Sequence, residues 1–287
     1  MKFALNLAPS LGWEAARNTG RLPMPDRIEA PEDPLDESKP WPVRIYTLGQ
    51  FEVIRGNQPL RLSRKAERRP RSLLKAIIAF GGQNVSEERL VDALWPEAHG
   101  DAARFSLTSA IHRLRRLLEH PGSMIRQEHQ IGLNPQLVWV DLWGVERLLE
   151  RSERYASAAN FGAMARSVWT AAALYKGGFL SGESAAPWAR PLTDRLRRRL
   201  LEQLLQAGKH IEQSERPEDA VTCFERCLSI DPCAEDACRQ LMSVYHRLGR
   251  PAEVLSVYHR CRDALNRRLG LIPSAQTEAL LKEPMPR

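Results

Sequence analysis

The chain has 287 residues, a formal net charge of +7 and a hydrophobic fraction of 43%. This length allows roughly two folded domains, and the composition excludes a chain that is disordered throughout. Its apolar runs are shorter than the ~20 residues of a membrane-spanning helix, and no long apolar segment follows the N-terminus as in an export signal. We therefore expect a cytoplasmic protein with no membrane partner.

Residues 1–42 contain seven prolines and the acidic string EAPEDPLDESKPWP. This composition buries too little apolar surface to offset the entropy lost on ordering, so it predicts a flexible leader. The next segment, VRIYTLGQFEVIRGNQPLRL, is rich in β-branched and aromatic residues and is interrupted by Gly49 and Gly56. It predicts two or more short antiparallel strands.

Three helices are predicted next. RRPRSLLKAIIAFGG places Pro70 in a first helical turn and ends on two glycines, and VSEERLVDALW begins with Ser86 as a helix cap. The third helix is predicted over residues 102–119, with Asp101 as its cap and the sequence HPG after its end.

The segment MIRQEHQIGLNPQLVWVDL alternates apolar and polar residues around LNPQ, which predicts a β-hairpin turning at residues 133–136. Strands, three helices and a hairpin, in that order, are the plan of a winged helix-turn-helix domain. In that domain the third helix enters the major groove of DNA and the hairpin flanks it. We assign this domain to residues 43–142.

From residue 143 the pattern is helical and contains an internal repeat. RPEDAVTCFERCLSI begins at Arg216 and RPAEVLSVYHRCRDAL begins at Arg250, 34 positions later. Thirty-four residues is the period of the tetratricopeptide repeat, a pair of helices that stacks on its neighbours. The predicted fold is mainly α with a small β portion: the winged helix-turn-helix, an all-α tetratricopeptide-like domain over residues 143–283, and a tail over 284–287.

Five cysteines lie in the last quarter of the chain. Their spacing lacks the C-x2-C pairs of a zinc ribbon, and an odd number argues against a closed disulfide framework. Because Cys227 and Cys261 occupy equivalent repeat positions, we interpret the cysteines as buried packing residues and expect no metal or other cofactor. They are Cys223, Cys227, Cys233, Cys238 and Cys261.

The third predicted helix is amphipathic. Its apolar residues recur at steps of four, three and four and predict a buried face. Residues 61–126 carry 13 Lys and Arg against 7 Asp and Glu. Such a local excess is typical of a polyanion-binding protein, although a run of charge is more often only a solvated face. The apolar residues are Leu107, Ile111, Leu114 and Leu118.

The position of this helix, third and just before the hairpin, favours DNA binding. We predict that Arg113 and His112 face bases, because arginine can bind guanine through two hydrogen bonds. Contacts with phosphate need only charge and reach, and we assign them to Arg115, Arg116 and the hairpin residue Arg126. The whole predicted DNA-binding set is Arg104, Thr108, Ser109, His112, Arg113, Arg115, Arg116, Arg126 and His129.

Several stretches resemble known domains. LGQFEVIRGNQPLRL, RSLLKAIIAFGGQNVSEERLVDALWP and AIHRLRRLLE resemble the OmpR/PhoB-type winged-helix domain. The segment from ALYKGGFLSG through PWARPLTDRLRRRLLEQLL to YHRCRDALNRRLGLIPSAQTEAL resembles the bacterial transcriptional activator domain. In this order, over about residues 43–283, the pair resembles the regulator family typified by activators of antibiotic-biosynthesis gene clusters.

The resemblance implies a sequence-specific transcription regulator, usually an activator, that binds repeated sites in double-stranded promoter DNA and contacts RNA polymerase. The groove-reading helix of the family corresponds to residues 102–119, and the loop WPEAHGDA before it is the implied polymerase contact. The sequence shows no receiver domain ahead of the winged helix and no G-x-x-x-x-G-K-[ST] phosphate loop. We therefore expect no control by aspartyl phosphorylation in cis, while homodimerisation and the activating signal stay open.

A second hypothesis is a protein-interaction adaptor, in which the repeats bind partners on a concave face and the winged helix is a docking module. An enzyme is not expected. The sequence shows no nucleophile-plus-base arrangement, no metal-ligand spacing and no phosphate loop, so no catalytic or metal-binding residue is predicted.

Overall fold

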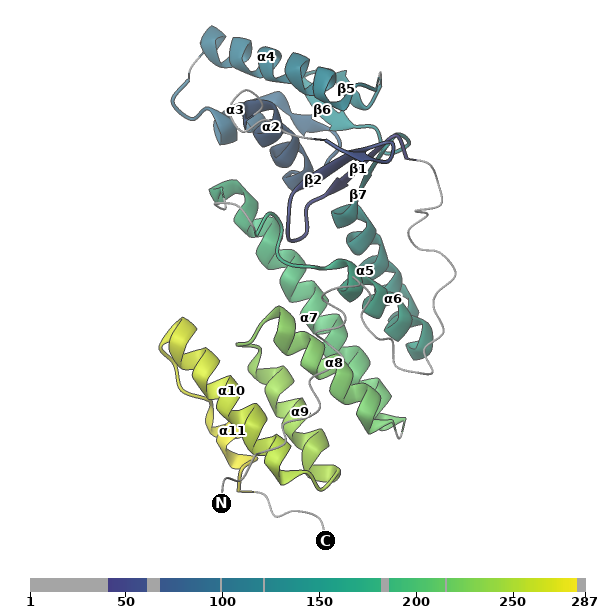
Figure 1. Cartoon of the computed structure of the whole chain (residues 1–287), viewed down its shortest axis with the longest axis vertical. Coiled ribbons are helices and arrows are strands. Elements are labelled where there is room, and N and C mark those ends of the chain that lie inside the picture. Colours follow the sequence, from purple (N-terminus) through teal and green to yellow (C-terminus); the bar gives the residue numbers. More distant parts are fainter. Residues whose placement is uncertain are drawn as a thin grey trace, which may run out of the picture. The chain divides into compact units, whose positions relative to one another are not determined.

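A computed structural model describes residues 41–60, 68–98, 100–120, 122–181, 186–214 and 216–282. Residues 1–40 of the predicted leader and the predicted tail over 284–287 lie outside the described residues. The described chain is mostly helical with a small proportion of sheet, which confirms the predicted fold class (Figure 1). None of its helices combines the length and hydrophobicity needed to cross a membrane.

The internal contacts divide the chain into two units. The described residues of Asp33–Val145 and Tyr175–Leu196 form the winged-helix unit, and those of Glu146–Leu174 and Arg197–Arg287 form the helical unit. The domain bounds that we inferred from the sequence stay a prediction.

The first sheet of the winged-helix unit confirms the short antiparallel strands predicted after the leader. β2 pairs antiparallel with β1 and with β3, while β7 joins the other edge of β1 in parallel. Gly56 has a left-handed φ of +56°, which a glycine adopts without strain in the tight turn between β2 and β3. Across the sheet the strands are β3 (Gln58–Pro59), β2 (Glu52–Arg55), β1 (Val43–Tyr46) and β7 (Val138–Val140).

The three helices predicted next are all present. The Ser86 hydroxyl caps the second of them by accepting the Arg89 N–H at 3.4 Å, as predicted. The prediction that Asp101 caps the third helix is wrong, because that helix begins at Gly100 and Asp101 lies in its first turn. Gly100 has a φ of +58°, a left-handed conformation that glycine adopts without strain where the chain enters the helix. The helices are α2 (Arg68–Ala79), α3 (Glu87–Leu94) and α4 (Gly100–Leu118).

The predicted hairpin exists, but its predicted turn is wrong. The chain reverses at Glu128 and His129, whose φ angles of +48° and +62° are uncommon for residues other than glycine, so the sequence carried no usual turn signal. The LNPQ sequence instead leads from β6 into β7, which belongs to the other sheet. The second sheet contains β4 (Val85–Ser86), β6 (Gln130–Leu133) and β5 (Met124–Gln127), in that order.

A buried carboxylate fastens the end of β1 to the start of α5 (Asp141–Ser157). The Asp141 side chain is 3% exposed and accepts the backbone N–H groups of Thr47 and Leu48 at 2.8–2.9 Å. It also accepts the Thr47 hydroxyl and the N–H of Leu142, each at 2.7 Å. One side chain thus satisfies several buried donors that would otherwise have no partner.

A later segment completes the winged-helix unit. The Leu180 N–H donates to the Thr47 carbonyl at 2.8 Å, and the Gly49 N–H donates to the Gly178 carbonyl at 3.1 Å. In the short 3-10 helix η1 (Pro187–Ala189), the Trp188 ring meets the Phe80 ring edge to face, with centroids 6.1 Å apart. The contacts of this segment therefore join it to the winged-helix unit.

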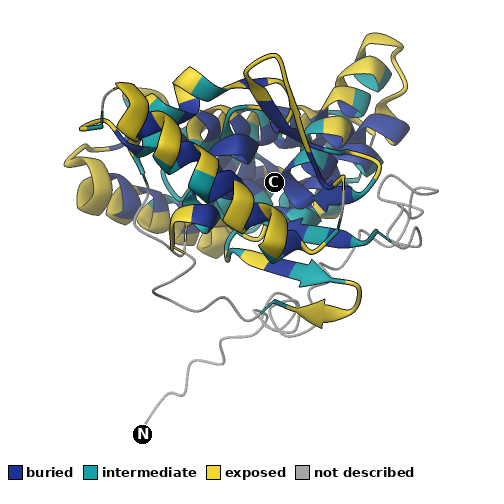
Figure 2. Cartoon of the chain, turned by 90° about the horizontal axis from the view of Figure 1, so that it is seen from above, coloured by how far each residue is buried: buried dark blue, intermediate teal, exposed yellow. Residues whose placement is uncertain are grey.

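The helical unit is built from helices whose buried and exposed residues alternate with the helical period. Such alternation along helices of the chain is visible in Figure 2. The apolar face of α7 is buried, with Leu196, Leu200, Leu204 and Ala207 along it. Besides the later parts of α5 and α7 (Arg190–Gln213), the unit contains α6 (Phe161–Leu174), α8 (Pro217–Ile230), α9 (Glu235–Arg247), α10 (Pro251–Leu269) and α11 (Ala275–Ala279).

Residues that lie 34 positions apart in the repeat have equivalent places in the packing of the helices. α9 contacts both α8 and α10, and residues separated by the period, such as Cys227 and Cys261, are both buried. Four of the five cysteines are buried, as predicted, whereas Cys233 is half-buried; all five are free thiols. Burial raises the pKa of the Cys223 thiol to about 12, so this side chain stays neutral and packs as an apolar group.

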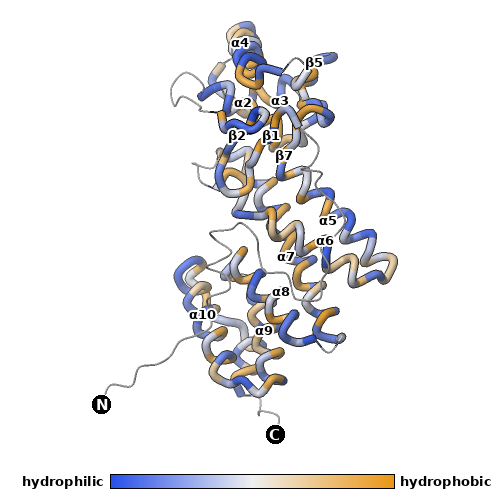
Figure 3. Tube along the Cα trace, turned by 45° about the vertical axis from the view of Figure 1, so that its right-hand side comes forward, coloured by the Kyte–Doolittle hydropathy of each residue, from blue (hydrophilic) through white to orange (hydrophobic). Residues whose placement is uncertain are grey.

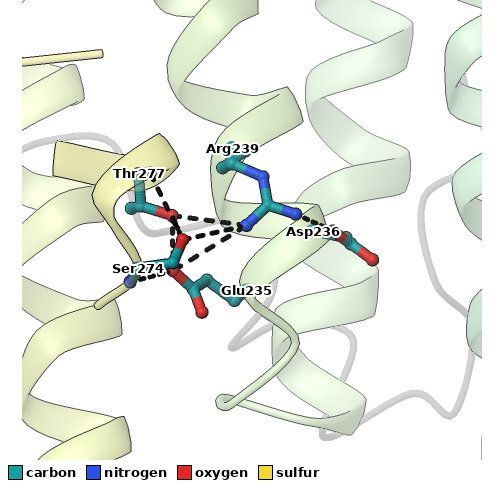
Figure 4. Close-up of polar contacts among 5 residues, drawn as sticks. All are labelled: Glu235, Asp236, Arg239, Ser274 and Thr277. Atoms are coloured by element: carbon teal, nitrogen blue, oxygen red, sulfur yellow. Dashed lines mark hydrogen bonds and ion pairs between the residues drawn. The ribbon is translucent and has the colours of Figure 1, made fainter. Parts of the chain in front are cut away.

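A polar cluster fastens α11 to α9 (Figure 4). The Glu235 carboxylate accepts the backbone N–H of Ser274 at 2.6 Å and the hydroxyl of Thr277 at 2.5 Å. The Arg239 guanidinium donates to the Thr277 hydroxyl at 3.4 Å and pairs with Asp236. Thr277 is fully buried, so this cluster holds the short final helix by paired polar groups.

Candidate nucleic-acid interface

Helix α4 has one face in the core of the winged-helix unit and one in solvent. It is 19 residues long, which corresponds to about 28 Å. It packs on α2 and α3, and hydrophilic and hydrophobic residues alternate along it (Figure 3). The predicted apolar face is confirmed by its buried residues, which are Ala103, Leu107, Ala110, Ile111, Leu114 and Leu118.

The opposite face of α4 carries most of the predicted DNA-binding residues. At 100° per residue, Phe105, His112 and Arg116 project within about 40° of one another, opposite the buried residues. Arg113 and Arg115 project about 80° to either side of Phe105. Ser109 is half-buried, and the other predicted residues of this helix are exposed: Arg104, Thr108, His112, Arg113, Arg115 and Arg116.

The arginines of α4 lack the acidic partners that arginines of the repeats have. In the helical unit, Arg250 pairs with Glu218 at 2.6 Å and Arg260 pairs with Glu225 at 2.5 Å. Among the described residues, no acidic side chain forms an ion pair with Arg104, Arg113, Arg115 or Arg116. The exposed face of α4 therefore presents positive charge that the described part of the fold does not neutralise.

The predicted wing residues are held by α3. Arg126 in β5 donates through Nε to Glu87 Oε1 at 2.6 Å and through Nη2 to Oε2 at 3.2 Å. The His129 ring nitrogen Nδ1 lies 3.8 Å from the same carboxylate. The Arg126 guanidinium, through its hydrogen bonds, holds the pKa of Glu87 below its ordinary value. Arg126 and His129 thus share Glu87 and lie with one another rather than with the arginines of α4.

A shallow hollow of about 330 Å³ lies where α4 meets the connection to β5. Its α4 wall includes His112, Arg115 and Arg116, and Glu119 at its edge pairs with Arg55 at 2.7 Å. The hollow gives the C-terminal half of α4 a concave border with mixed charge. Nothing in its lining forms a metal site, since no group of three His, Cys, Asp or Glu that could hold a metal ion occurs among the described residues.

Two residues of this surface were not predicted from the sequence. Glu87 was not singled out, because its contact with Arg126 spans 39 positions. Phe105 is 78% exposed, although the other large apolar residues of α4 are buried or half-buried. A helical projection of residues 102–119 could have shown that Phe105 falls on the basic face.

Known proteins share this architecture. Residues 140–283 match the family model of the bacterial transcriptional activator domain. The regulatory protein AfsR of Streptomyces griseus is 26% identical over 267 residues, which cover 88% of this chain and 26% of the relative. AfsR of Streptomyces coelicolor is 27% identical over 251 residues, which cover 85% of this chain and 24% of the relative. The chain thus spans about a quarter of the length of these relatives.

A solved structure of Mycobacterium tuberculosis EmbR, in complex with a low-affinity phosphopeptide, has the same fold with a TM-score of 0.62 and 20% identity. The similarity covers 84% of this chain and 64% of that one. The family model spans half of the chain and includes the whole repeat region. The chain therefore belongs to the family of the bacterial transcriptional activator domain.

Proposed function

We propose that this chain is a sequence-specific DNA-binding regulator of transcription, of the activator type, that binds promoter DNA through α4 and the wing. The observation that carries the proposal is the row of arginines on α4 that have no acidic partner in the described structure. Neutralising phosphates and releasing their counterions is the main source of affinity in protein–DNA binding. A regulatory rather than catalytic role agrees with the family to which the chain belongs.

The helical unit is proposed to supply the other functions of a regulator: dimerisation, signal input or contact with RNA polymerase. The stack of α8, α9 and α10 is a tetratricopeptide-like surface, and such repeats bind other proteins. We place the protein in the cytoplasm, on the nucleoid when bound to DNA. The loop before α4 is the proposed polymerase contact.

The proposal is tested by measuring affinity for promoter DNA against salt concentration. With roughly 4 to 6 phosphate contacts, log affinity should fall against log salt with a slope of about −4 to −5. Arg115→Ala with Arg116→Ala should weaken binding and make the slope shallower by about 2. A binding signal that is absent or independent of salt would overturn the proposal.

The chain offers a matched control for this experiment. Arg267 and Arg268 are an adjacent pair in the last turn of α10, just as Arg115 and Arg116 are in α4, and both helices have 19 residues. Arg267→Ala with Arg268→Ala removes the same charge from the helical unit. An equal loss of affinity in both double variants would indicate a general charge effect rather than a DNA-binding face.

The roles of single residues stay predictions. The sequence assigns Arg113 to a base, whereas the helical projection places Arg116 nearer the centre of the exposed face than Arg113. Each is changed to alanine and measured on a selected site and on random DNA. A base contact should cost about 1 to 3 kcal/mol on the selected site alone, while a phosphate contact should weaken both equally.

The adaptor hypothesis makes a different prediction for the same variants. If the repeats alone carry the function, Arg115→Ala with Arg116→Ala should lose DNA binding and keep full activity in the cell. The regulator proposed here should lose both together.

A further inference from the structure

One apolar side chain interrupts the basic face of α4. Phe105 is 78% exposed, and its neighbour Arg104 and the residue one turn later, Thr108, are also exposed. The apolar residues that serve the core lie on the other side of the helix. Because the core and the apolar stripe of α4 are complete without Phe105, its ring is available to a ligand of the basic face.

The position of Phe105 along the helix fits the base edges rather than the phosphates. A recognition helix contacts bases with its N-terminal residues, and Phe105 is the sixth of the 19 residues of α4. In projection it lies midway between Arg113 and Arg115, about 80° from each. A residue at the centre of the exposed face, opposite the buried residues, faces the groove floor when the helix lies in the groove.

The chemistry of the ring limits what it can recognise there. A phenyl ring has no hydrogen-bonding group, and the one apolar group on the major-groove edges of the four bases is the 5-methyl group of thymine. We propose that Phe105 is a specificity-determining residue that selects thymine by packing against this methyl group. The inference rests on the proposed function and adds to it the identity of a base.

The positive charge around Phe105 argues for DNA as the occupant. Arg104 lies next to it in the sequence, and His112 and Arg116 share its projected face. An apolar protein partner would have to bury or neutralise the two arginines, whereas a DNA groove supplies phosphates for them. A protein partner is therefore treated as an alternative outcome of the test.

The test removes only the methyl group. The bound sequence is first selected from random DNA with the full chain, and each thymine of the selected site is then replaced singly by deoxyuridine, which keeps the base pair. The wild type should lose about three- to fivefold in affinity at one position, the effect of removing one buried methyl group. Phe105→Ala should bind the thymine site less tightly and should show no further loss at that deoxyuridine.

Two control variants accompany the test. Phe105→Leu keeps an apolar side chain and should retain part of the preference for thymine. Leu255→Ala removes an apolar side chain that is 51% exposed in α10 and should leave the preference unchanged. Circular dichroism and melting temperature should be the same for Phe105→Ala and the wild type, because Phe105 makes little contact with the core.

The outcomes separate this inference from the proposed function. Salt-dependent binding with equal affinity for every deoxyuridine site would overturn the role of Phe105 and leave the proposed function standing. A chain that binds no DNA would overturn both. If Phe105→Ala lowers transcription while the discrimination between thymine and deoxyuridine persists, Phe105 contacts a protein and the inference is wrong.

Discussion

Glu87 at the start of α3 holds the guanidinium of Arg126 in the wing by two hydrogen bonds of 2.6 and 3.2 Å. The pair joins the hairpin to the helix that precedes α4. Phosphate and carboxylate bind arginine in the same two-pronged way, so in the proposed complex a DNA phosphate would compete with Glu87 for Arg126. If the wing binds DNA as proposed, its availability would depend on one carboxylate.

Glu87→Gln should strengthen binding to DNA. The substitution removes the negative charge that competes with phosphate for Arg126, so the slope of log affinity against log salt should become steeper by up to about 1. The measurement is a salt titration of affinity for a fixed duplex by fluorescence anisotropy.

Glu88→Gln is the matched control for this change, because Glu88 is the next residue in the same helical turn and is exposed. It removes an equal charge without releasing Arg126. If the two variants change the slope equally, Arg126 does not gain a phosphate contact when Glu87 is neutralised.

The same contact should make stability depend on acidity. Arg126 lowers the pKa of Glu87, so the stabilisation is complete above the ordinary carboxyl pKa and is lost as the pH falls through the lowered value. The pair is partly exposed and should contribute about 0.2 to 1 kcal/mol. Urea unfolding of the wild type and Glu87→Gln should show this difference at pH 7 and less of it at pH 3. If the difference in unfolding free energy between the two proteins increases in acid, the contact with Arg126 does not lower the pKa of Glu87.

Asp141→Ala should strongly destabilise the winged-helix unit. The change leaves the buried N–H groups of Thr47 and Leu48 without their acceptor, and each such loss costs about 1 to 3 kcal/mol. We expect a total of about 3 kcal/mol or more in urea unfolding. Asp101→Ala, at an exposed position in the first turn of α4, should cost less than about 1 kcal/mol. Equal costs would show that the buried donors find other acceptors.

Thr277→Val should loosen α11 without unfolding the helical unit. The variant keeps the shape of the side chain and removes the hydroxyl that donates to Glu235 at 2.5 Å, a loss of about 1 kcal/mol. Hydrogen exchange of the α11 amides should become faster. Thr222→Val is the control, since the Thr222 hydroxyl donates only within its own helix, to the Glu218 carbonyl. Unchanged exchange in α11 would mean that apolar contacts alone hold it.

Local patterns predicted the helices well, because their apolar stripes and caps lie within a few residues. The stripe from Leu107 to Leu118 and the Ser86 cap are examples. Contacts between distant segments carried no such signal. The strand β4, the Glu87 contact with Arg126 and the Asp141 anchor each depend on pairing across many positions.

The hairpin shows a second reason for failure. Its turn uses left-handed backbone at Glu128 and His129, a conformation that is uncommon for residues other than glycine. The strong turn signal at LNPQ marks a passage between two sheets instead. For the proposed DNA-binding face, the sequence analysis named the basic residues but not Phe105, which was not placed on either face of the helix.

The β-bridge between Leu48 and Phe179 affects when the winged-helix unit is completed during synthesis and how the chain can be cut into fragments. The winged-helix unit is complete only when the chain has been synthesised beyond residue 180, so its last contacts form after α5 and α6 have been made. No single proteolytic cut separates the two units with all their contacts intact, because each draws on two stretches of chain. A fragment that ends before Tyr175 therefore lacks part of the winged-helix unit.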